Sequence, residues 1–342
     1  MALHLGVTGG QGPESDRIYD VIIVGGGAAG LTAGLYASRA KMDALLLEKS
    51  VWGGQIAFTG LVENYPGFPD GAMGPDLAIW MYEQATKQGL QTLSTEVTGI
   101  ELRGQIRVVQ TIDGDFLAKA VVVASGGEHR KLGVPGEEEY AARGVSNCAV
   151  CDGAFFRGEI VAVIGGGDAA IDEGLYLTRL AKQVLVIHRR DQLRASPVLQ
   201  ERAFATPNMS FIWNSVVEEV LGDTNQVTGI RVRNVKTNEP SVLDVTGVFI
   251  YIGFDPAAAI LGDLVEQDEH GYIRVTDLMA TNVPGVFAAG DIRVNSLRQL
   301  VSAAGDGCVA GLSAYKYVTE EFKDWEEGAA VAATRSASNA AQ

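Results

Sequence analysis

The fold is decided by the stretch Ile160-Val161-Ala162-Val163-Ile164-Gly165-Gly166-Gly167-Asp168-Ala169-Ala170. An apolar strand runs here directly into a glycine turn that opens a helix. In such a unit one glycine makes the tight turn, another lets the backbone approach a pyrophosphate, and the N-terminus of the helix faces the phosphates. A Cys-x-x-Cys pair, Cys148 and Cys151, precedes the unit. Together they predict a dinucleotide site in a domain that also carries a redox-capable dithiol.

A second unit of the same kind lies near the N-terminus. The expected strand Tyr19–Val24 leads into the turn Gly25-Gly26-Gly27-Ala28-Ala29-Gly30, and a helix is expected over Leu31–Ala40. The next expected strand, Ala44–Leu47, ends at Glu48, whose carboxylate is placed to accept hydrogen bonds from a ribose diol. Glycines, strand, helix and acid in this order form a specific dinucleotide fingerprint.

The two units differ at the end of their second strand. His188 follows Gly165 at the same spacing at which Glu48 follows Gly25, and it begins the run His188-Arg189-Arg190, with Arg194 beyond. A carboxylate there would repel a 2′-phosphate, whereas guanidinium groups bind it in bidentate fashion. The second site is therefore predicted to bind NADPH, and the first a dinucleotide with a plain ribose, as in FAD. The alternative for the arginines is a solvated charge run.

Composition bounds the functional class. The chain has 342 residues, which is enough for two domains, and a net charge of −15, which argues against nucleic-acid binding. The three cysteines and four histidines lack the spacing of a zinc site, so no metal is expected. No apolar run reaches the about 18 residues of a membrane span. A reducing, cytoplasmic setting is expected, where a lone Cys-x-x-Cys is more often catalytic than structural.

Further patterns outline the remaining chain. Residues 1–16 and 326–342 have compositions typical of a disordered leader and tail, and the polar stretch Lys131–Glu139 has the character of a domain crossing. Residues 52–74 form a long Gly- and Pro-rich loop, which in a compact domain tends to be functional. Helices are expected over Asp76–Gln88 and from about Arg298 to Val318.

With these motifs in place, the sequence resembles the low-molecular-weight thioredoxin reductases, which are flavin-dependent pyridine nucleotide–disulfide oxidoreductases. The resemblance extends from about Tyr19 to Tyr317. It rests on Cys-Ala-Val-Cys-Asp-Gly at 148–153, His-Arg-Arg-x-x-x-Arg at 188–194, Gly-Gly-Gln at 53–55, Glu-Asn-Tyr-Pro-Gly at 63–67, Gly-Asp at 290–291 and Arg-Gln at 298–299.

The resemblance implies an α/β fold with two Rossmann-like, three-layer dinucleotide-binding domains, and a homodimer. A discontinuous FAD domain would take residues 17–131 and 261–325, with the NADPH domain, 132–260, inserted between them. Thioredoxin would be the protein partner.

The resemblance also implies roles for individual residues. Cys151 would be the sulfur next to the flavin, Cys148 the interchange thiol that attacks the partner's disulfide, and Asp152 the general acid and base. FAD would be held by Gly25, Gly27, Gly30, Glu48, Gln55, Asn64, Asp291 and Gln299. NADPH would be held by Gly165, Gly167, Arg189, Arg190 and Arg194.

The chemistry also follows from the residues. Hydride from NADPH passes to a flavin, which passes two electrons to a disulfide, and the reduced pair attacks a second disulfide through a mixed disulfide. The alternatives are the same enzyme with another donor such as ferredoxin, a flavin-dependent small-molecule dithiol oxidase, the reductase part of a peroxide-reducing system, and a redox-sensing binding module. The first two would not need the arginine cluster, the third usually brings an extra dithiol domain, and the last leaves two nucleotide sites unexplained.

Overall fold

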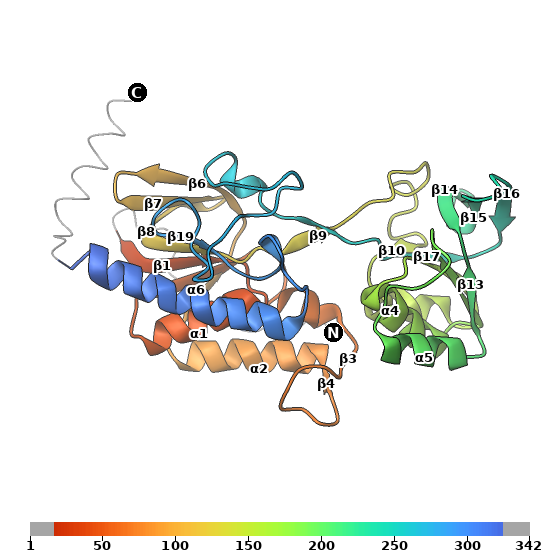
Figure 1. Ribbon diagram of the computed structural model, residues 1–342, viewed down its shortest axis with the longest axis horizontal. Helices are drawn as coiled ribbons and strands as arrows, with labels where there is room; N and C mark the ends of the chain where they lie inside the picture. The colour runs from red at the N-terminus through yellow and green to blue at the C-terminus, as the bar shows by residue number, and fades with distance from the viewer. Residues whose placement is uncertain (1–16, 324–342) are drawn as a thin grey trace. The chain divides into compact units, whose positions relative to one another are not determined.

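The chain forms two compact units, each described by itself below. The computed structural model describes residues 17–323 (Figure 1). Within this range unit 1 comprises residues 17–57, 61–128 and 256–323, and unit 2 comprises 58–60 and 129–255. The expected disordered leader, 1–16, and tail, 326–342, lie outside the described residues.

Unit 1 is built on a seven-stranded sheet in which the order is β5-β2-β1-β8-β7-β6, with β19 also paired to β8. Five strands run parallel, namely β1 (Ile18–Val24), β2 (Ala44–Glu48), β5 (Gln91–Ser94), β8 (Gly114–Val123) and β19 (Val286–Ala288). The antiparallel strands β6 (Val97–Arg103) and β7 (Ile106–Thr111) complete it. Because Val286 pairs with Val121, the last part of the chain completes a sheet that the first part begins.

Three helices pack on one face of this sheet: α1 (Ala28–Arg39), α2 (Gly74–Lys87) and α6 (Leu300–Glu321) (Figure 1). The side chains of β1 alternate between the two faces, as the period of two in a strand requires. Val21 and Ile23 pack under the helices, whereas Ile22 and Val24 belong to a second core on the opposite face. Both faces of β1 are therefore buried, which explains its almost continuous apolar sequence.

The close approach of α1 and α6 depends on glycine. A Cβ atom on Gly307 would lie 2.1 Å from the carbonyl oxygen of Ala29, and one on Gly311 would lie 2.6 Å from that of Ala33. These distances are shorter than any real Cβ contact, so the two backbones pack directly against each other. The C-terminal helix is thereby fixed against the helix that follows the first glycine turn.

Unit 2 has three layers. Its central parallel sheet has the order β10-β17-β11-β12-β13, formed by β10 (Val145–Ser146), β17 (Gly247–Ile250), β11 (Ile160–Ile164), β12 (Gln183–Ile187) and β13 (Met209–Ile212). Helices α4 (Asp168–Thr178) and α5 (Pro197–Ala205) pack on one face. An antiparallel sheet of β14 (Ser215–Gly222), β15 (Val227–Asn234) and β16 (Pro240–Leu243) packs on the other (Figure 1). The mixed α/β class with parallel dinucleotide-type sheets is thus as predicted.

The remaining elements are short. They are β3 (Leu61–Val62), β4 (Ala72–Met73), β9 (Gly127–His129), β18 (Phe254–Pro256) and α3 (Ala149–Asp152). The chain crosses between the units at 128/129 and at 255/256, and the two crossing segments pair with each other as β9 and β18. In residues 17–323 no helix is both long and apolar enough to cross a bilayer.

Some local expectations need correction. The segment 52–74 is not loop throughout, because it contains a short 3₁₀ turn and the β3–β4 pair. Strand β14 was not predicted from the sequence. In β14 the apolar residues Val217 and Val220 are both buried across a register irregularity, which breaks the simple alternation that marks a strand.

The helix contact of unit 1 yields a stability prediction. We expect Gly307→Ala to lower the free energy of unfolding by about 1–3 kcal/mol or more, because the new methyl group must displace the backbone of α1. The matched control is Gly305→Ala on the same helix, where a Cβ atom would meet nothing within 4 Å. This control should be neutral or stabilising by up to about 1 kcal/mol. Equal denaturant midpoints for the two variants would show that α1 and α6 do not pack in this way.

Candidate functional site

The first glycine turn has the shape of a phosphate cradle. Gly25 has φ +105°, and a Cβ atom there would lie 2.4 Å from the carbonyl oxygen of Ala124. A Cβ atom on Gly30 would lie 1.8 Å from the carbonyl oxygen of Gly25. In contrast, a Cβ atom on Gly27, the N-cap of α1, would meet nothing within 4 Å. Two glycines are therefore needed for close packing, whereas the third leaves open space in front of the helix N-terminus, where a pyrophosphate can lie.

Glu48 ends β2 beside this turn. Its Oε2 atom accepts a hydrogen bond from the Gly26 N–H at 2.6 Å, and its Oε1 atom accepts one from the Ser50 N–H at 2.7 Å. The backbone thus fixes the carboxylate at the carboxyl end of the strand, which is where ligands bind in open parallel sheets.

The structure brings together several other predicted residues that lie far apart in the chain. Asn64 Nδ2 donates to Gln299 Oε1 at 3.1 Å. Asp291 accepts a hydrogen bond from Ser296 Oγ at 2.9 Å, and burial raises the pKa of its carboxyl group. Gln55 is exposed in the 3₁₀ turn Gly54–Phe58.

The residue before Asp291, Gly290, packs against the glycine turn. Gly290 has φ +80°, and a Cβ atom on it would lie 2.9 Å from the Cβ atom of Ala29 in the first turn of α1. The C-terminal part of the chain therefore contributes to the surroundings of the first turn.

Sequence analysis missed the ion pair that holds this segment. Asp306, buried on α6, accepts hydrogen bonds from Arg293 at 2.5 and 2.9 Å and from the Gly290 N–H at 3.1 Å. Both oxygens of Asp306 are thus paired, which fixes the backbone on either side of Asp291. The only signal in the sequence is an acidic residue on the apolar face of a helix.

The second turn, in unit 2, repeats this design. Gly165 has φ +145°, and a Cβ atom there would lie 2.4 Å from the carbonyl oxygen of Tyr251. A Cβ atom on Gly167, the N-cap of α4, would again meet nothing within 4 Å. The position of the third glycine is occupied by Ala170, which is fully buried.

The residues predicted to recognise a 2′-phosphate gather at this turn. The imidazole of His188 packs on Gly166, where a Cβ atom would lie 2.5 Å from the ring. The Arg194 N–H donates to the Gly166 carbonyl oxygen at 2.7 Å, which ties the arginine-bearing loop to the turn. Burial lowers the pKa of His188, and the charges of Arg194, Arg190 and Arg189 lower it further. The positive charges of the three guanidinium groups therefore all act on the imidazole of His188.

These three arginines are exposed. Among the described residues none of them forms an ion pair within 4.0 Å. Asp191, their neighbour in sequence, binds Lys236 at 2.8 Å instead. The cluster is therefore available to an anion.

Cys148 and Cys151 form a disulfide with their Cα atoms 5.4 Å apart. Cys148 is the N-cap of α3, and its sulfur accepts a hydrogen bond from the Cys151 N–H at 3.1 Å. Ser146 Oγ donates to Asp152 Oδ2 at 2.7 Å and accepts from the Cys148 N–H at 3.0 Å. Ser146, which was not predicted, thus links the carboxylate to the first cysteine.

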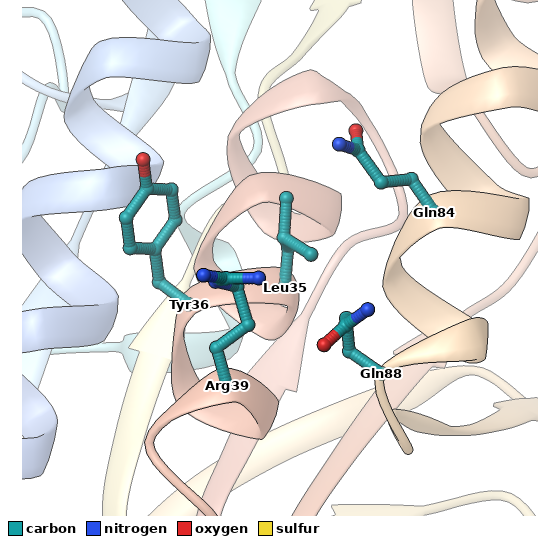
Figure 2. A pocket seen from close by; sticks show the side chains of 5 residues that line it. All are labelled: Leu35, Tyr36, Arg39, Gln84 and Gln88. Carbon is teal, nitrogen blue, oxygen red and sulfur yellow. The ribbon is translucent and has the colours of Figure 1, made fainter.

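A hollow on unit 1 contains none of the predicted residues. It has a volume of 280 Å³ and lies between α1, which contributes Leu35, Tyr36 and Arg39, and α2, which contributes Gln84 and Gln88 (Figure 2). Arg39 ends α1, so it lies about 16 Å along the helix from the glycine turn. This hollow is not part of the candidate site. In the described part of the chain no group of three or more His, Cys, Asp or Glu residues could hold a metal ion.

Comparisons with known proteins agree with this geometry. Residues 19–307 match the profile of the pyridine nucleotide-disulphide oxidoreductases. The chain is 48% identical to a thioredoxin reductase of Listeria monocytogenes over 311 residues, covering 91% of this chain and 97% of the relative. It is 46% identical to one of Bacillus subtilis over 307 residues, covering 90% and 97%.

Solved structures give the same result. The crystal structure of Lactococcus lactis thioredoxin reductase matches with a TM-score of 0.87 at 48% identity, covering 88% of this chain and 99% of that one. The crystal structure of T. acidophilum thioredoxin reductase matches with a TM-score of 0.84 at 37% identity, covering 88% of this chain and 98% of that one. The chain belongs to the pyridine nucleotide-disulphide oxidoreductase family and, within it, to the thioredoxin reductases.

Proposed function

We propose that this enzyme uses NADPH and FAD to reduce the disulfide of thioredoxin, or of a thioredoxin-like protein, through the Cys148–Cys151 pair. The observation that carries the proposal is the disulfide at the start of α3, in the same unit as a glycine turn with a free arginine cluster. The relatives named above are thioredoxin reductases, which supports the substrate.

The residues of unit 1 fit FAD. The open space at Gly27, framed by the close-packed Gly25 and Gly30, suits a pyrophosphate, and Glu48 suits a ribose diol. The other residues assigned to FAD are Gln55, Asn64, Asp291 and Gln299. When bound, the flavin supplies the ability to accept a hydride and to release two electrons to a disulfide.

The residues of unit 2 fit NADPH. Gly165 and Gly167 shape the turn for the pyrophosphate, and Arg189, Arg190 and Arg194 offer hydrogen-bond donors to a 2′-phosphate. A donor without that phosphate, such as ferredoxin, would leave this cluster without a purpose.

The dithiol performs the exchange. Once the pair is reduced, the Cys148 thiolate attacks a sulfur of the thioredoxin disulfide and releases the other as a thiolate, which takes up a proton. Cys151 then attacks Cys148 in the mixed disulfide, which restores the Cys148–Cys151 bond and releases reduced thioredoxin. Asp152, held by Ser146, accepts and returns the proton.

Unit 2 also presents a surface for a protein partner. Phe155 lies four residues after Cys151 and is 82% exposed. A large exposed aromatic side chain so close to a redox disulfide suits an interface, where aromatic residues contribute most of the binding energy. A homodimer and a reducing, cytoplasmic location complete the proposal. The homodimer rests on the resemblance to the family, and the location rests on the use of cysteine in the chain.

The donor is tested by removing positive charge. We expect Arg189→Ala with Arg190→Ala to lower kcat/KM for NADPH by at least about 100-fold, because each arginine loses a hydrogen bond to the phosphate worth about 1.5–3 kcal/mol. The value for NADH should change little. The control is Arg179→Ala, an exposed arginine at the other end of α4. Equal losses with both nucleotides would mean that the cluster does not read the 2′-phosphate.

The electron path is tested at the dithiol. In Cys151→Ser we expect NADPH to bleach the flavin absorbance under anaerobic conditions while thioredoxin reduction falls to background, because no disulfide can form. Cys308→Ser, which changes the free cysteine on α6, should retain full turnover. Thioredoxin reduction by the Cys151→Ser enzyme would contradict the mechanism.

The partner surface is tested at Phe155. We expect Phe155→Ala to raise KM for thioredoxin by about 5- to 30-fold, as for an interface aromatic, with little effect on a small disulfide such as dithionitrobenzoate. Phe204→Ala, 57% exposed on α5 of the same unit, serves as the control. If both substrates lose activity equally, Phe155 acts on the dithiol itself and not on the partner.

A further inference from the structure

The two glycine turns differ at the first residue of the helix that follows each of them. The N-cap is Gly27 in unit 1 and Gly167 in unit 2, and the next residue is the buried Ala28 in unit 1 but Asp168 in unit 2. Both residues come directly after the glycine that leaves open space in front of the helix. A carboxylate at this place repels the pyrophosphate of any dinucleotide. The acid of unit 2 therefore has a cost for binding, which calls for a compensating role.

The carboxylate of Asp168 is bonded to a distant part of the chain. Its Oδ1 atom accepts a hydrogen bond from the Ser196 N–H at 2.5 Å, across 28 positions in sequence. Ser196 is the N-cap of α5, and it ends the loop that follows β12 and carries the three arginines. Hydrogen bonds to a charged acceptor are shorter and stronger than those between neutral groups. Asp168 thus joins the first residue of α4 to the far end of the arginine loop.

The neighbouring residues of this loop are also fixed. The N–H groups of Arg194 and Ala195 both donate to the carbonyl oxygen of Gly166, at 2.7 and 3.1 Å. The side chains of Leu193 and Ala195 are buried in the core that includes α4, whereas the side chain of Arg194 between them is exposed. The backbone on both sides of Arg194 is therefore held, and the bond to Asp168 follows directly after it.

Unit 1 has one of these contacts but not the other. After β2 the Gly53 N–H donates to the carbonyl oxygen of Gly26 at 2.8 Å, just as the Arg194 N–H donates to that of Gly166. The first turn of α1 contains no acidic residue, so the contact made by Asp168 has no counterpart there. The additional hydrogen bond therefore occurs in the unit whose loop carries the arginine cluster.

We propose that Asp168 is a positioning residue for the choice of nucleotide: its carboxylate holds the arginine loop against the glycine turn in the arrangement that binds a 2′-phosphate. A loop that is fixed before its ligand arrives loses less conformational freedom on binding, and its affinity is higher for that reason. The inference deepens the proposed binding of NADPH by unit 2 and rests on it.

The carboxylate has two properties that can be separated by mutation. Its charge acts on the pyrophosphate, which nucleotides with and without the 2′-phosphate share, whereas its hydrogen bond acts on the loop that only the 2′-phosphate needs. Asn in place of Asp168 keeps an acceptor oxygen without the charge, and Ala keeps neither. Both replacements lose the favourable interaction of an acid with a helix N-terminus, so this loss cannot explain a difference between them.

The test compares Asp168→Asn and Asp168→Ala with the wild type in the FAD-loaded enzyme. The matched control is Asp223→Ala, because Asp223 also accepts backbone hydrogen bonds in unit 2, from the N–H groups of Asn225 and Gln226 at 2.7 and 3.0 Å, but lies between β14 and β15. Titration calorimetry gives Kd for NADP⁺, and displacement of NADP⁺ gives Kd for NAD⁺. Hydrogen–deuterium exchange without nucleotide follows the amides of residues 194–196, and thermal unfolding shows that each variant is folded.

We expect Asp168→Ala to lower the preference for NADP⁺ over NAD⁺ by about 3- to 10-fold, because the arrangement that binds the 2′-phosphate is then populated only part of the time. Asp168→Asn should keep the preference and bind both nucleotides about 2- to 5-fold more tightly, since the repelling charge is gone. The amides of residues 194–196 should exchange faster in Asp168→Ala but not in Asp168→Asn. The control should match the wild type in all three measurements.

The results distinguish failure of the inference from failure of the proposed function. If the wild type binds NAD⁺ as tightly as NADP⁺, the nucleotide proposed for unit 2 is wrong and the inference fails with it. If the wild type prefers NADP⁺ and Asp168→Ala keeps that preference, the inference alone fails. It also fails if Asp168→Asn loses the preference as Asp168→Ala does, or if the preference falls without faster exchange of the loop.

Discussion

The whole structure depends on a backbone contact that only glycine permits. In each unit the first residue of the turn lies against the carbonyl oxygen that follows a neighbouring strand, with a Cβ position 2.4 Å away from it: Gly25 against Ala124 and Gly165 against Tyr251. The contact holds the glycine turn beside the end of the neighbouring strand. The N-terminus of the helix that follows the turn therefore lies at the carboxyl end of the sheet. Open space at Gly27 and Gly167 follows in front of both helices. The same constraint has thus been met twice in one chain with different side chains around it.

The side chains around the two turns differ, and these differences suit the two units to different roles. At the first turn, the C-terminal segment comes close through Gly290 and is held by the paired carboxylate of Asp306. That arrangement requires α6 to lie directly on α1, which the glycines of α6 allow. At the second turn no distant segment is needed, because the arginine loop folds back onto Gly166 from a few residues beyond its strand. Unit 1 is therefore assembled from both ends of the chain, whereas unit 2 folds from one continuous segment apart from residues 58–60.

This difference explains which features of the fold and of the site could be predicted from the sequence. The glycine turns, their strands and the dithiol are local patterns, and they were predicted with their neighbours. Asn64 and Gln299 came only from resemblance, because nothing local relates two residues so far apart. Asp306 and Ser146 were missed altogether. Each has a meaning only through a tertiary contact, and by itself each is an ordinary polar residue on a helix or strand. Strand β14 was missed for a related reason, since its burial follows an irregular register and not a simple alternation.

The charge distribution of unit 2 sets its arginine cluster apart from its other basic residues. The protein carries 42 acidic and 27 basic residues, so a basic cluster could readily be neutralised by nearby carboxylates. Both arginines of the antiparallel sheet are neutralised in this way, Arg231 by Glu219 and Arg233 by Glu218. Arg189, Arg190 and Arg194 are not, and Asp191 between them binds Lys236. Uncompensated positive charge favours a bound anion, and this suits a phosphate that must be recognised.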